Sequence, residues 1–328
     1  MTNAAGLYLF TSMPDGLVKP EVILTHESDL DGLVAGVLLK RLANHLFKED
    51  VPLIAYHTGE WLSRKFSEAT GWVADLGVSP KMDKPGWLII DHHTLEYNPK
   101  HAVLIHSSQK SASLLAYELC NKYGIRSQKL DRLVHLSNVA DLFLEDDPDF
   151  VTACDYAALV KTYRFWNLIL LIDWEIEKLL DHPLLEVIAT KRRIEDPIGK
   201  AWALENMVEL APGIAYVDTV IGNTNVIVNE LLSTESLPYQ VLITITRQGD
   251  GSLSASIRSK NGEAINIARK LNGGGHPNAS GAQLPKHIKT IQEAIAFMQR
   301  ILNANTERAI NPLNAALSSL PKLKTAQE

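Results

Sequence analysis

Short apolar runs alternate with longer amphipathic stretches along the first part of the chain. The runs have the length of strands, whereas the stretches have the length and apolar spacing of helices. Strands are expected at 22–24, 51–56, 71–75, 87–90 and 102–105, and helices at 32–47, 111–123 and 131–143. Such alternation is typical of a mainly parallel sheet with helices on both faces. The pattern therefore predicts an α/β fold whose first domain, residues 1–149, is a doubly wound, mainly parallel sheet.

The acidic, proline-containing segment at 145–149 ends this pattern. Residues 150–210 look helical, and we interpret 150–205 as a helical connector. Apolar residues recur along it at roughly helical spacing: Trp166, Ile169, Leu170, Ile176, Leu179 and Leu180. We expect this stripe to be packed core, and the alternative is the face of a homodimer.

A second α/β region follows the connector. Alternating apolar residues on either side of a turn at 249–251 predict a β-hairpin. The other expected elements are a strand at 214–217 and helices at 222–233, 263–271 and 286–303. We therefore expect a smaller C-terminal α/β domain at 206–305 and a loosely held tail at 306–328.

Composition limits the class of protein. The 328 residues suffice for about two domains, and an apolar content of 46% with 21% charged residues is ordinary for a globular protein. The net charge of −6 excludes a global basic field that would attract nucleic acid. Cys120 and Cys154 are far apart in sequence and are expected to be reduced thiols. Neither a signal-sequence pattern nor a membrane-length apolar run is present, so we expect a cytoplasmic protein without a membrane partner.

Several expected strands end in carboxylate or imidazole groups, where a parallel sheet usually holds its ligand. The candidate groups are His26, Asp29, Asp31, Asp75, Asp91, His92, His93 and Asp141. Singly, an Asp after a strand is more often a helix cap, and a lone His is more often a core residue. Together, the carboxylates would repel one another unless cations neutralised them. Carboxylate and imidazole ligands suit manganese, iron, cobalt or zinc, while the lack of cysteine ligands argues against structural zinc. The sequence therefore predicts a site for two divalent metal ions.

Four motifs are similar to the signature motifs of the DHH phosphoesterase superfamily. They are THESDLDG, the Asp in GWVADLG, IIDHH and the Asp in SNVADLF, and they occur in the superfamily's order. The stretch GGGHPNASG, preceded by SASIRSK, resembles the GGGH-type substrate domain that accompanies DHH domains in one branch. The resemblance covers most of the chain, and five ordered motifs make it specific.

The resemblance implies a role for each candidate residue. His26 and Asp29 match ligands of one metal, Asp31, His92 and Asp141 match ligands of the other, and Asp75 matches the carboxylate that bridges both. His93 matches a catalytic residue that faces the transferred phosphate as hydrogen-bond donor or acid. Asp91 is a second catalytic candidate that would orient an imidazole. The metal pair is expected to be manganese, with magnesium or cobalt as alternatives.

The substrate end of the molecule is expected in the C-terminal domain. Arg258 offers a bidentate fork suited to phosphate, and the glycine-rich loop could form an anion-binding nest, although three glycines can also make only a flexible turn. By the resemblance, the substrate-binding residues are Arg258, Ser259, Gly273, Gly274, Gly275 and His276.

We expect a metal-dependent phosphoesterase in which a metal-bridging hydroxide attacks phosphorus. The expected substrates are short single-stranded oligonucleotides or small nucleotides, such as nanoRNA, linear or cyclic dinucleotides or 3′-phosphoadenosine 5′-phosphate. One alternative is a RecJ-like single-strand DNA exonuclease, which would normally have a longer basic groove. A second alternative, of a different class, is a non-catalytic protein that binds RNA or nucleotides. An inorganic pyrophosphatase would share the first domain but not the GGGH half.

Overall fold

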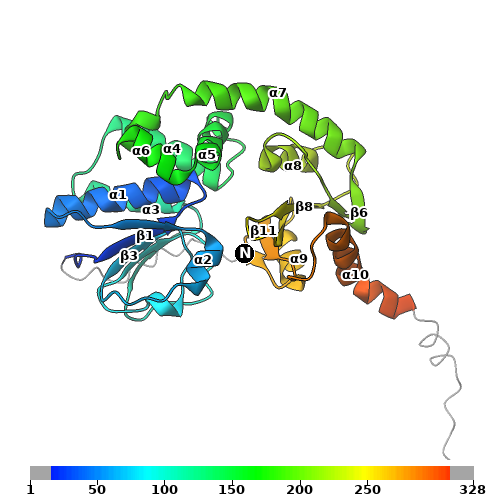
Figure 1. Ribbon diagram of the computed structural model, residues 1–328, viewed down its shortest axis with the longest axis horizontal. Helices are drawn as coiled ribbons and strands as arrows, with labels where there is room; N and C mark the ends of the chain where they lie inside the picture. The colour runs from blue at the N-terminus through cyan, green and yellow to red at the C-terminus, as the bar shows by residue number, and fades with distance from the viewer. Residues whose placement is uncertain (1–15, 311–328) are drawn as a thin grey trace, which may run out of the picture. The chain divides into compact units, whose positions relative to one another are not determined.

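The computed structural model describes residues 16–310. The chain divides into two compact units, one ending at Ile194 and the other beginning at Glu195. Figure 1 shows the elements of both units, which are described separately below. Among residues 16–310, we find no helix with both the length and the apolar character needed to cross a membrane.

The first unit is built on a parallel sheet of five strands in the order β2-β1-β3-β4-β5. The strands are β1 (Val22–His26), β2 (Leu53–Tyr56), β3 (Gly71–Ala74), β4 (Leu88–Asp91) and β5 (Val103–His106). All of these strands were expected from the sequence, and so was their parallel pairing. The strand order reverses between β1 and β3, and the crevice beyond the carboxyl ends at such a switch point is where open α/β sheets bind ligands.

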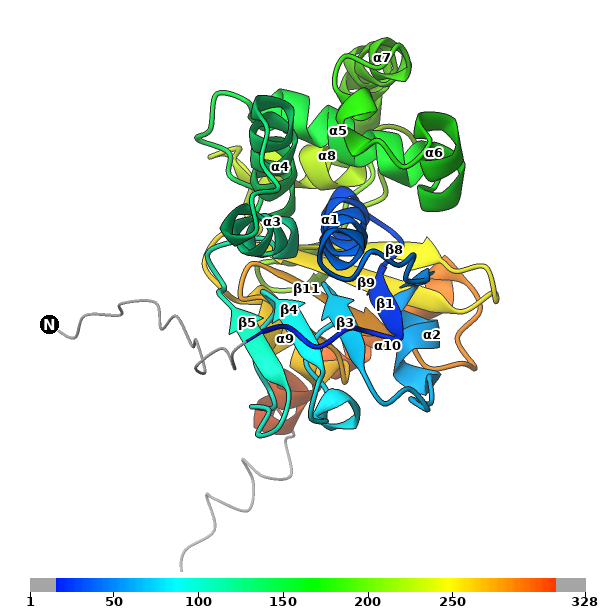
Figure 2. The same ribbon diagram turned by 90° about the vertical axis from the view of Figure 1, so that its left-hand side faces the viewer.

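Both faces of this sheet are apolar, which explains why its strands are continuous apolar runs. Ile23 packs with helices α1 (Leu30–Phe47), α3 (Ala112–Lys122) and α4 (Gln128–Asp141). Its neighbour Leu24 packs on the opposite face with Trp61 and Trp87. That second face is covered by the short helix α2 (Thr58–Ser63) and the 3₁₀ turn η1 (Pro80–Met82). Figure 2 shows α1 and α3 on one side of the strands and α2 on the other. The predicted α/β class with helices on both faces is confirmed.

The helical segment after residue 149 packs into the core of the first unit. It contains α5 (Phe150–Tyr163), α6 (Phe165–Ile172) and the 3₁₀ turn η2 (Ile176–Leu179), followed by α7 (Leu184–Glu205). From the predicted stripe, Ile169, Ile176 and Leu179 are buried in this core, whereas Leu170 is 76% exposed. The stripe is therefore mainly core, as expected. The helical stretch does not run to residue 210, because β6 begins at Val208.

The second unit has a mixed sheet of six strands in the order β10-β11-β9-β8-β7-β6. The strands are β6 (Val208–Ala211), β7 (Ile214–Tyr216), β8 (Val241–Arg247), β9 (Leu253–Ser259), β10 (Gly274–Gly275) and β11 (Ala279–Gln283). β8 and β9 form the predicted antiparallel hairpin, and only the β7–β8 pair is parallel among the described pairings. β6, β10 and β11 were not expected. β10 and β11 are rich in Gly, Ala and Ser and carry little apolar periodicity, and β6 lies at the end of the stretch that looked helical.

Helices cover the two faces of this second sheet. Helix α8 (Thr224–Leu232) packs on the face that includes Leu242 of β8. Helices α9 (Ala264–Lys270) and α10 (Ile291–Ile310) pack on the other face, against Ile243 and Ile257. Helix α10 continues past the predicted end at 303, and the predicted tail at 306–328 lies mostly outside the described residues.

Candidate metal centre

The acid- and imidazole-bearing residues of the first unit meet at the carboxyl edge of its sheet. His26 ends β1, Asp75 follows β3, and Asp91 ends β4 with His92 directly after it. Because β1 and β3 flank the switch point, the cluster occupies the place where this topology forms a ligand crevice. Helix α4 adds Asp141, its last residue.

One group of metal-competent atoms comes from His26, Asp29 and Asp75. Nδ1 of His26 lies 2.6 Å from Oδ2 of Asp29 and 3.6 Å from Oδ2 of Asp75. The other oxygen of Asp29 accepts a hydrogen bond from the backbone N–H of Gly32 at 2.9 Å, so Asp29 is also the N-cap of α1. The two interpretations of Asp29, helix cap and metal ligand, are therefore compatible, because each uses a different carboxylate oxygen.

Gly32 allows α1 to start this close to the strand. A Cβ atom at Gly32 would lie 2.2 Å from the backbone oxygen of His26. The hydroxyl of Thr25 also donates to the carbonyl oxygen of Gly32 at 2.5 Å, within the buried junction. The glycine of the THESDLDG motif thus sets the distance between the first acids of α1 and the histidine of β1.

A second group of ligand-type atoms comes from Asp31, His92 and Asp141. Nε2 of His92 lies 3.3 Å from Oδ2 of Asp141 and 3.3 Å from Oδ1 of Asp75. Asp75 therefore stands between the two groups, with one oxygen toward His26 and the other toward His92. A third group of ligand-type atoms, from Asp75, His92 and His93, overlaps both of these groups. The division of the residues between two metals and the role of each residue therefore stay predictions.

Asp31 is fixed by the start of α3. Its two oxygens accept hydrogen bonds from the backbone N–H groups of Ala112, at 2.8 Å, and Ser113, at 2.9 Å. The hydroxyl of Ser137 on α4 approaches the same carboxylate at 3.4 Å. Asp31 is only 1% exposed. Each carboxylate oxygen can accept more than one contact, so these bonds orient Asp31 and still leave it able to bind a cation.

The pKa values of the cluster indicate that its acids lack sufficient positive charge nearby. Burial alone would lower the pKa of His26, but the carboxylates of Asp29 and Asp75 outweigh it and raise that pKa to about 11. Burial also opposes ionisation of Asp75, but His26 and His92 hold its pKa well below the usual range. Burial and the charge of Asp75 raise the pKa of Asp31 to about 6. Without a cation, the cluster thus needs protons on its imidazoles to stabilise its acids.

Two carboxylate oxygens indicate where positive charge fits. Oδ2 of Asp75 and Oδ2 of Asp141 are buried, and neither accepts a well-formed hydrogen bond from the described residues, although an imidazole nitrogen lies 3.6 Å from the first and 3.3 Å from the second. Burial and the charge of Asp31 raise the pKa of Asp141 well above its ordinary value. Buried carboxylate oxygens without donors are costly unless a cation binds them. The donor set, all oxygen and imidazole nitrogen, suits divalent ions of the manganese type.

The backbone at Asp75 is held in an uncommon conformation. Its φ angle is +59°, in the left-handed region, where Asp is tolerated better than most other residues. The N–H of Asp75 donates to the carbonyl oxygen of Ile90 at 3.1 Å. Conformations of this kind persist where surrounding structure enforces them, and they concentrate at functional sites.

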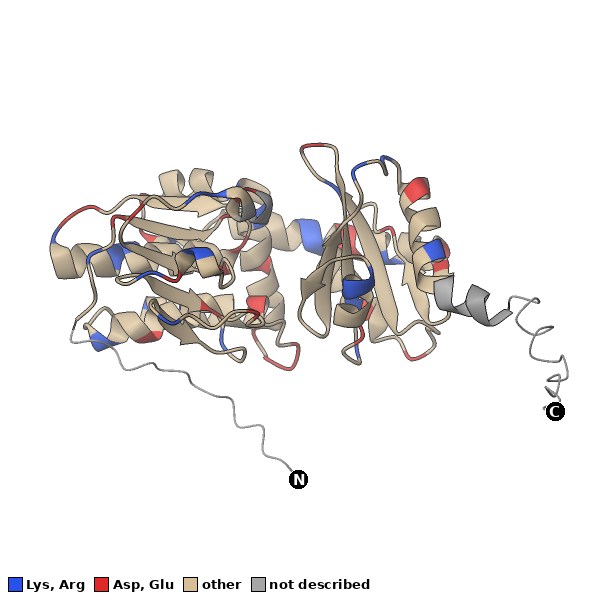
Figure 3. Ribbon diagram, turned by 90° about the horizontal axis from the view of Figure 1, so that it is seen from below, with Lys and Arg blue, Asp and Glu red and all other residues tan. Residues whose placement is uncertain are grey.

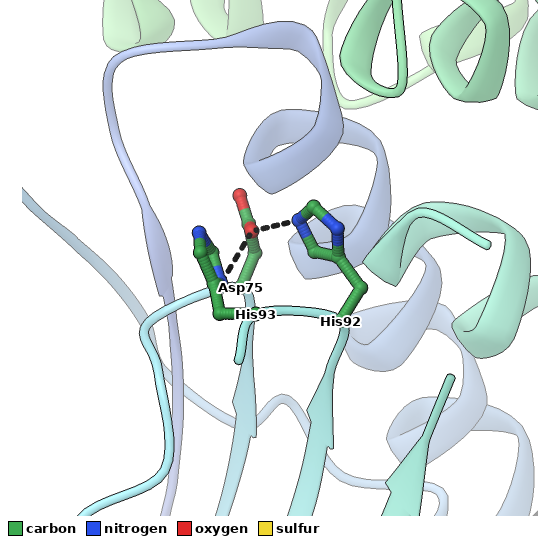
Figure 4. Close-up of side chains that lie close together, drawn as sticks. All are labelled: Asp75, His92 and His93. Atoms are coloured by element: carbon green, nitrogen blue, oxygen red, sulfur yellow. Dashed lines mark ion pairs between the residues drawn. The ribbon is translucent and has the colours of Figure 1, made fainter. Parts of the chain in front are cut away.

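His93 is more open than its neighbour His92. The side chain of His93 is 42% exposed, compared with 5% for His92. Nδ1 of His93 lies 3.1 Å from Oδ1 of Asp91, and that oxygen also accepts the backbone N–H of His93 at 2.7 Å. The other oxygen of Asp91 accepts the N–H of Gly77 at 2.7 Å. Figure 4 shows His92 and His93 approaching Asp75, with ion-pair distances of 3.3 Å and 3.9 Å.

Arg258 is a cation of the second unit without an acidic partner among the described residues. It lies on β9 and is partly buried, which lowers the pKa of its guanidinium. Figure 3 shows how the charged residues are distributed over the ribbon. Ser259, the next residue, is buried, and its hydroxyl accepts the N–H of Ala264 at 3.0 Å. Ser259 therefore has a role within the fold, and a direct role in binding stays a prediction.

The glycine-rich segment forms a strand edge as well as a loop. Gly274 pairs with Gly281, and Gly275 pairs with Ser280. A Cβ atom at Gly273 would lie 2.1 Å from the carbonyl oxygen of Gly281, and Gly275 has a φ angle of +134°. Close strand packing thus explains two of the three glycines, whereas a side chain at Gly274 would meet open space. His276 follows in a turn, where its N–H donates to the carbonyl oxygen of Ala279 at 2.8 Å.

Two features of the first unit were missed from the sequence. His106 ends β5, as His26 ends β1, and its Nε2 donates to the carbonyl oxygen of His93 at 2.7 Å. The signal was the same apolar run ending in a histidine. The second feature is the first turn of α3, whose N–H groups hold Asp31, and no side-chain pattern could have identified it.

A further acidic group lies around His135, Asp147 and Asp149. Arg132 forms a bidentate salt bridge with Asp149, and His135 lies 3.1 Å from the same carboxylate. The charge of Asp149 is thus already compensated, so this group differs from the cluster at the sheet edge.

The fold and the cluster define an α/β protein with a carboxylate–imidazole centre at the switch point of a parallel sheet. The model of the DHHA1 domain matches residues 215–304. A search of the curated proteins finds no match. This match confirms the expected GGGH-type domain at the C-terminal end, and the structural similarities that follow agree with the fold that the resemblance implies for the rest of the chain.

Three solved structures illustrate the similarity of fold. A pGpG-specific phosphodiesterase, PggH, from Vibrio cholerae has a TM-score of 0.51 at 16% identity, covering 85% of this chain and 98% of that one. RecJ in complex with Mn²⁺ from Thermus thermophilus has a TM-score of 0.54 at 15% identity, covering 87% of this chain but 52% of that one. A DHH domain described as a member of the s1p family of ribosomal proteins has a TM-score of 0.55 at 15% identity, covering 89% and 87%. At these identities the similarity establishes the fold.

Proposed function

We propose that this protein is a metal-dependent phosphoesterase that acts on short oligonucleotides or small nucleotides. The observation that carries the proposal is the pair of ligand groups joined through Asp75, with buried oxygens of Asp75 and Asp141 that accept no well-formed hydrogen bond from the described residues. A purely structural cluster would satisfy these oxygens with donors from the protein.

The chain offers a ligand set for two divalent ions. His26 and Asp29 would hold one ion, Asp31, His92 and Asp141 the other, and Asp75 would contact both. A bound pair of this kind supplies a water nucleophile at neutral pH and offsets the charge that develops on a phosphoryl group. Manganese suits these ligands, and two RecJ structures of similar fold are described with manganese.

The remaining residues of the centre would position the substrate. His93 is exposed enough to contact a phosphate, and Asp91 would hold its ring by the 3.1 Å contact at Nδ1. An imidazole held in this way can donate a hydrogen bond or a proton to a phosphate ester oxygen. Asp91 would therefore position His93, without contacting the substrate itself.

Short substrates are favoured by the charge and by the second unit. The net charge of −6 gives no general attraction for a long polyanion. Arg258 is a single guanidinium that could bind one phosphate. PggH, with a similar fold over nearly its whole length, is described as specific for the dinucleotide pGpG. The Thermus RecJ, described as a Mn²⁺ complex, is about twice as long as the region of similarity.

A turnover panel with manganese tests the proposal. It would contain 5′-phosphorylated dinucleotides, longer single strands, 3′-phosphoadenosine 5′-phosphate, cyclic dinucleotides and pyrophosphate. We expect release of mononucleotide or phosphate from the small substrates, with loss of turnover in EDTA. Preferred cleavage of long single-stranded DNA would favour the RecJ-like alternative. Binding without turnover on every substrate would show a non-catalytic nucleotide-binding protein instead.

A further inference from the structure

Arg258 projects from a strand whose two faces differ. Along β9, Ala255 and Ile257 are buried in the core beneath α9 and α10. Side chains alternate along a strand, so Arg258 points to the opposite face, where its cross-strand partner Leu242 packs with α8. Arg258 therefore lies beside α8.

The guanidinium of Arg258 has only neutral partners among the described residues. Nη1 donates to the carbonyl oxygen of Ile257 at 3.1 Å, and Nη2 donates to the side-chain oxygen of Asn225 at 3.3 Å. No described Asp or Glu forms an ion pair with it, and burial is the sole cause of its lowered pKa. A guanidinium has five N–H donors, so donors remain for a ligand.

Asn225 is a neutral residue at the start of α8. It lies in the first turn of α8, where the side chain of Asn223 caps the backbone N–H groups of Asn225 and Val226. The helix dipole favours Asp or Glu in this turn. An Asp at position 225 would be almost the same size, but its carboxylate would lie beside Arg258 and neutralise it. The amide oxygen orients the guanidinium and leaves its charge uncompensated.

We propose that Asn225 is a positioning residue that keeps Arg258 oriented and uncompensated, so that Arg258 binds a phosphate of the nucleotide substrate. The inference rests on the proposed function, because it assigns Arg258 to that substrate. It also adds a specificity element: a neutral side chain at position 225 selects an anionic ligand group, whereas a carboxylate would exclude it. Repulsion between a carboxylate at this position and the phosphate would add to the loss of the free cation.

The test compares Asn225→Ala with Asn225→Asp. The measurement is calorimetric binding of the 5′-phosphorylated dinucleotide pApA to the full chain in EDTA, where hydrolysis does not interfere. We expect Asn225→Ala to bind roughly fivefold more weakly, because one hydrogen bond that orients Arg258 is lost. Asn225→Asp should bind at least about 30-fold more weakly, because the new carboxylate pairs with the guanidinium.

A merely structural role predicts the opposite order. An Asp in the first turn should stabilise α8 relative to Ala, so Asn225→Asp would then bind at least as well as Asn225→Ala. That order would overturn the proposal, and so would failure of the wild-type protein to bind pApA. Asn266→Asp is the matched control, because it adds the same charge on α9, which covers the opposite face of the sheet. It should leave binding unchanged, and an equal loss in this variant would overturn the proposal.

Turnover separates this inference from the proposed function. Hydrolysis of bis-p-nitrophenyl phosphate with manganese, measured on the same preparations, should be the same in all four proteins, because Asn225 belongs to the second unit. If the wild-type protein hydrolyses nothing but the order of affinities holds, the phosphoesterase proposal fails and the role of Asn225 stands. If hydrolysis occurs but the three position-225 forms bind pApA equally, the role of Asn225 fails alone.

Discussion

The two sheets of this protein present opposite electrostatic problems. At the carboxyl edge of the first sheet, acids crowd together and the imidazoles between them need protons to balance the charge. On the second sheet, no acid among residues 16–310 pairs with Arg258 to balance it. The first site lacks positive charge, and the second lacks negative charge. The proposed function would answer both needs, because it combines divalent cations with a substrate that carries phosphate.

The difference also separates chemistry from affinity. Groups at the first site lie within contact distance of one another. Arg258 and Asn225 belong to a unit with its own core. Variants of the cluster in the first unit should therefore change turnover on every substrate, whereas variants of Arg258 or Asn225 should change affinity only for substrates with a phosphate that Arg258 can bind. The following predictions test that division.

The largest effect is expected for Asp75→Ala. Because Asp75 stands between both ligand groups, its loss should release metal and lower turnover by several orders of magnitude on all substrates. The measurements are turnover with manganese and metal content by mass spectrometry. Asp50→Ala, which removes an exposed acid of the same unit, is the control. Turnover above about a tenth of wild type with normal metal content would contradict the bridging role.

His93→Ala should lower turnover and keep the metals. Loss of a hydrogen-bond donor or acid at the substrate should reduce kcat by roughly 10²- to 10⁴-fold. Metal content should stay at the wild-type value, because the 42% exposed side chain of His93 is proposed to contact the substrate and is not among the predicted ligands. His101→Ala, at an exposed histidine of the same unit, should behave as wild type. A missing equivalent of metal would make His93 a ligand and would end its assignment as a substrate contact.

Arg258→Ala should act on affinity alone. Loss of a charge-assisted hydrogen bond should cost about 1.5–3 kcal/mol of binding energy, or about 10- to 150-fold in Kd for a phosphorylated dinucleotide. Hydrolysis of bis-p-nitrophenyl phosphate should barely change. Arg300→Ala on α10, on the opposite face, should affect neither. Equal losses on both substrates would mean that Arg258 supports the metal site or the fold, and the division into chemistry and affinity would be wrong.

The smallest effect is expected for metal on stability. Manganese at about ten times its Kd should stabilise the native protein by about 1.4 kcal/mol, which corresponds to a rise in Tm of roughly 3–6 °C for a unit of this size. Calorimetry with manganese and with EDTA measures the difference. The Asp75→Ala protein should show no such rise. An equal rise in that variant would place the manganese at another site.

The sheet of the first unit could be predicted because its strands are apolar on both faces. Leu24 and Ile23 pack on opposite sides, so the sequence shows a continuous apolar run that ends abruptly at the polar site. The same abrupt ends located His26, Asp75 and Asp91. Periodicity gave no such signal for β10, which consists of Gly274 and Gly275 and is defined by its pairing with β11.

The sequence could not predict which groups form hydrogen bonds with each side chain of the two sites. The contact between Asn225 and Arg258 joins residues 33 positions apart in the chain. Ala112 and Ser113 of α3, which donate their backbone N–H groups to Asp31, lie 81 and 82 positions after it in the chain. Almost every residue has a backbone N–H group, so the residue type does not show which of these groups donates to a site. A sequence pattern can therefore identify a candidate ligand but not the backbone that orients it.

The hydrogen bonds of Asp31 give it a structural role in addition to its predicted role as a metal ligand. The combination has a consequence for how the sequence can evolve. Its carboxylate anchors the start of α3 and contacts Ser137 of α4. A descendant that lost catalysis would be freer to change His93, whose side chain is 42% exposed, but would still require an acceptor at position 31 to keep its helices in register. Retention of an Asp at this position in a related chain is therefore weak support for activity, and retention of the exposed histidine is the more informative sign.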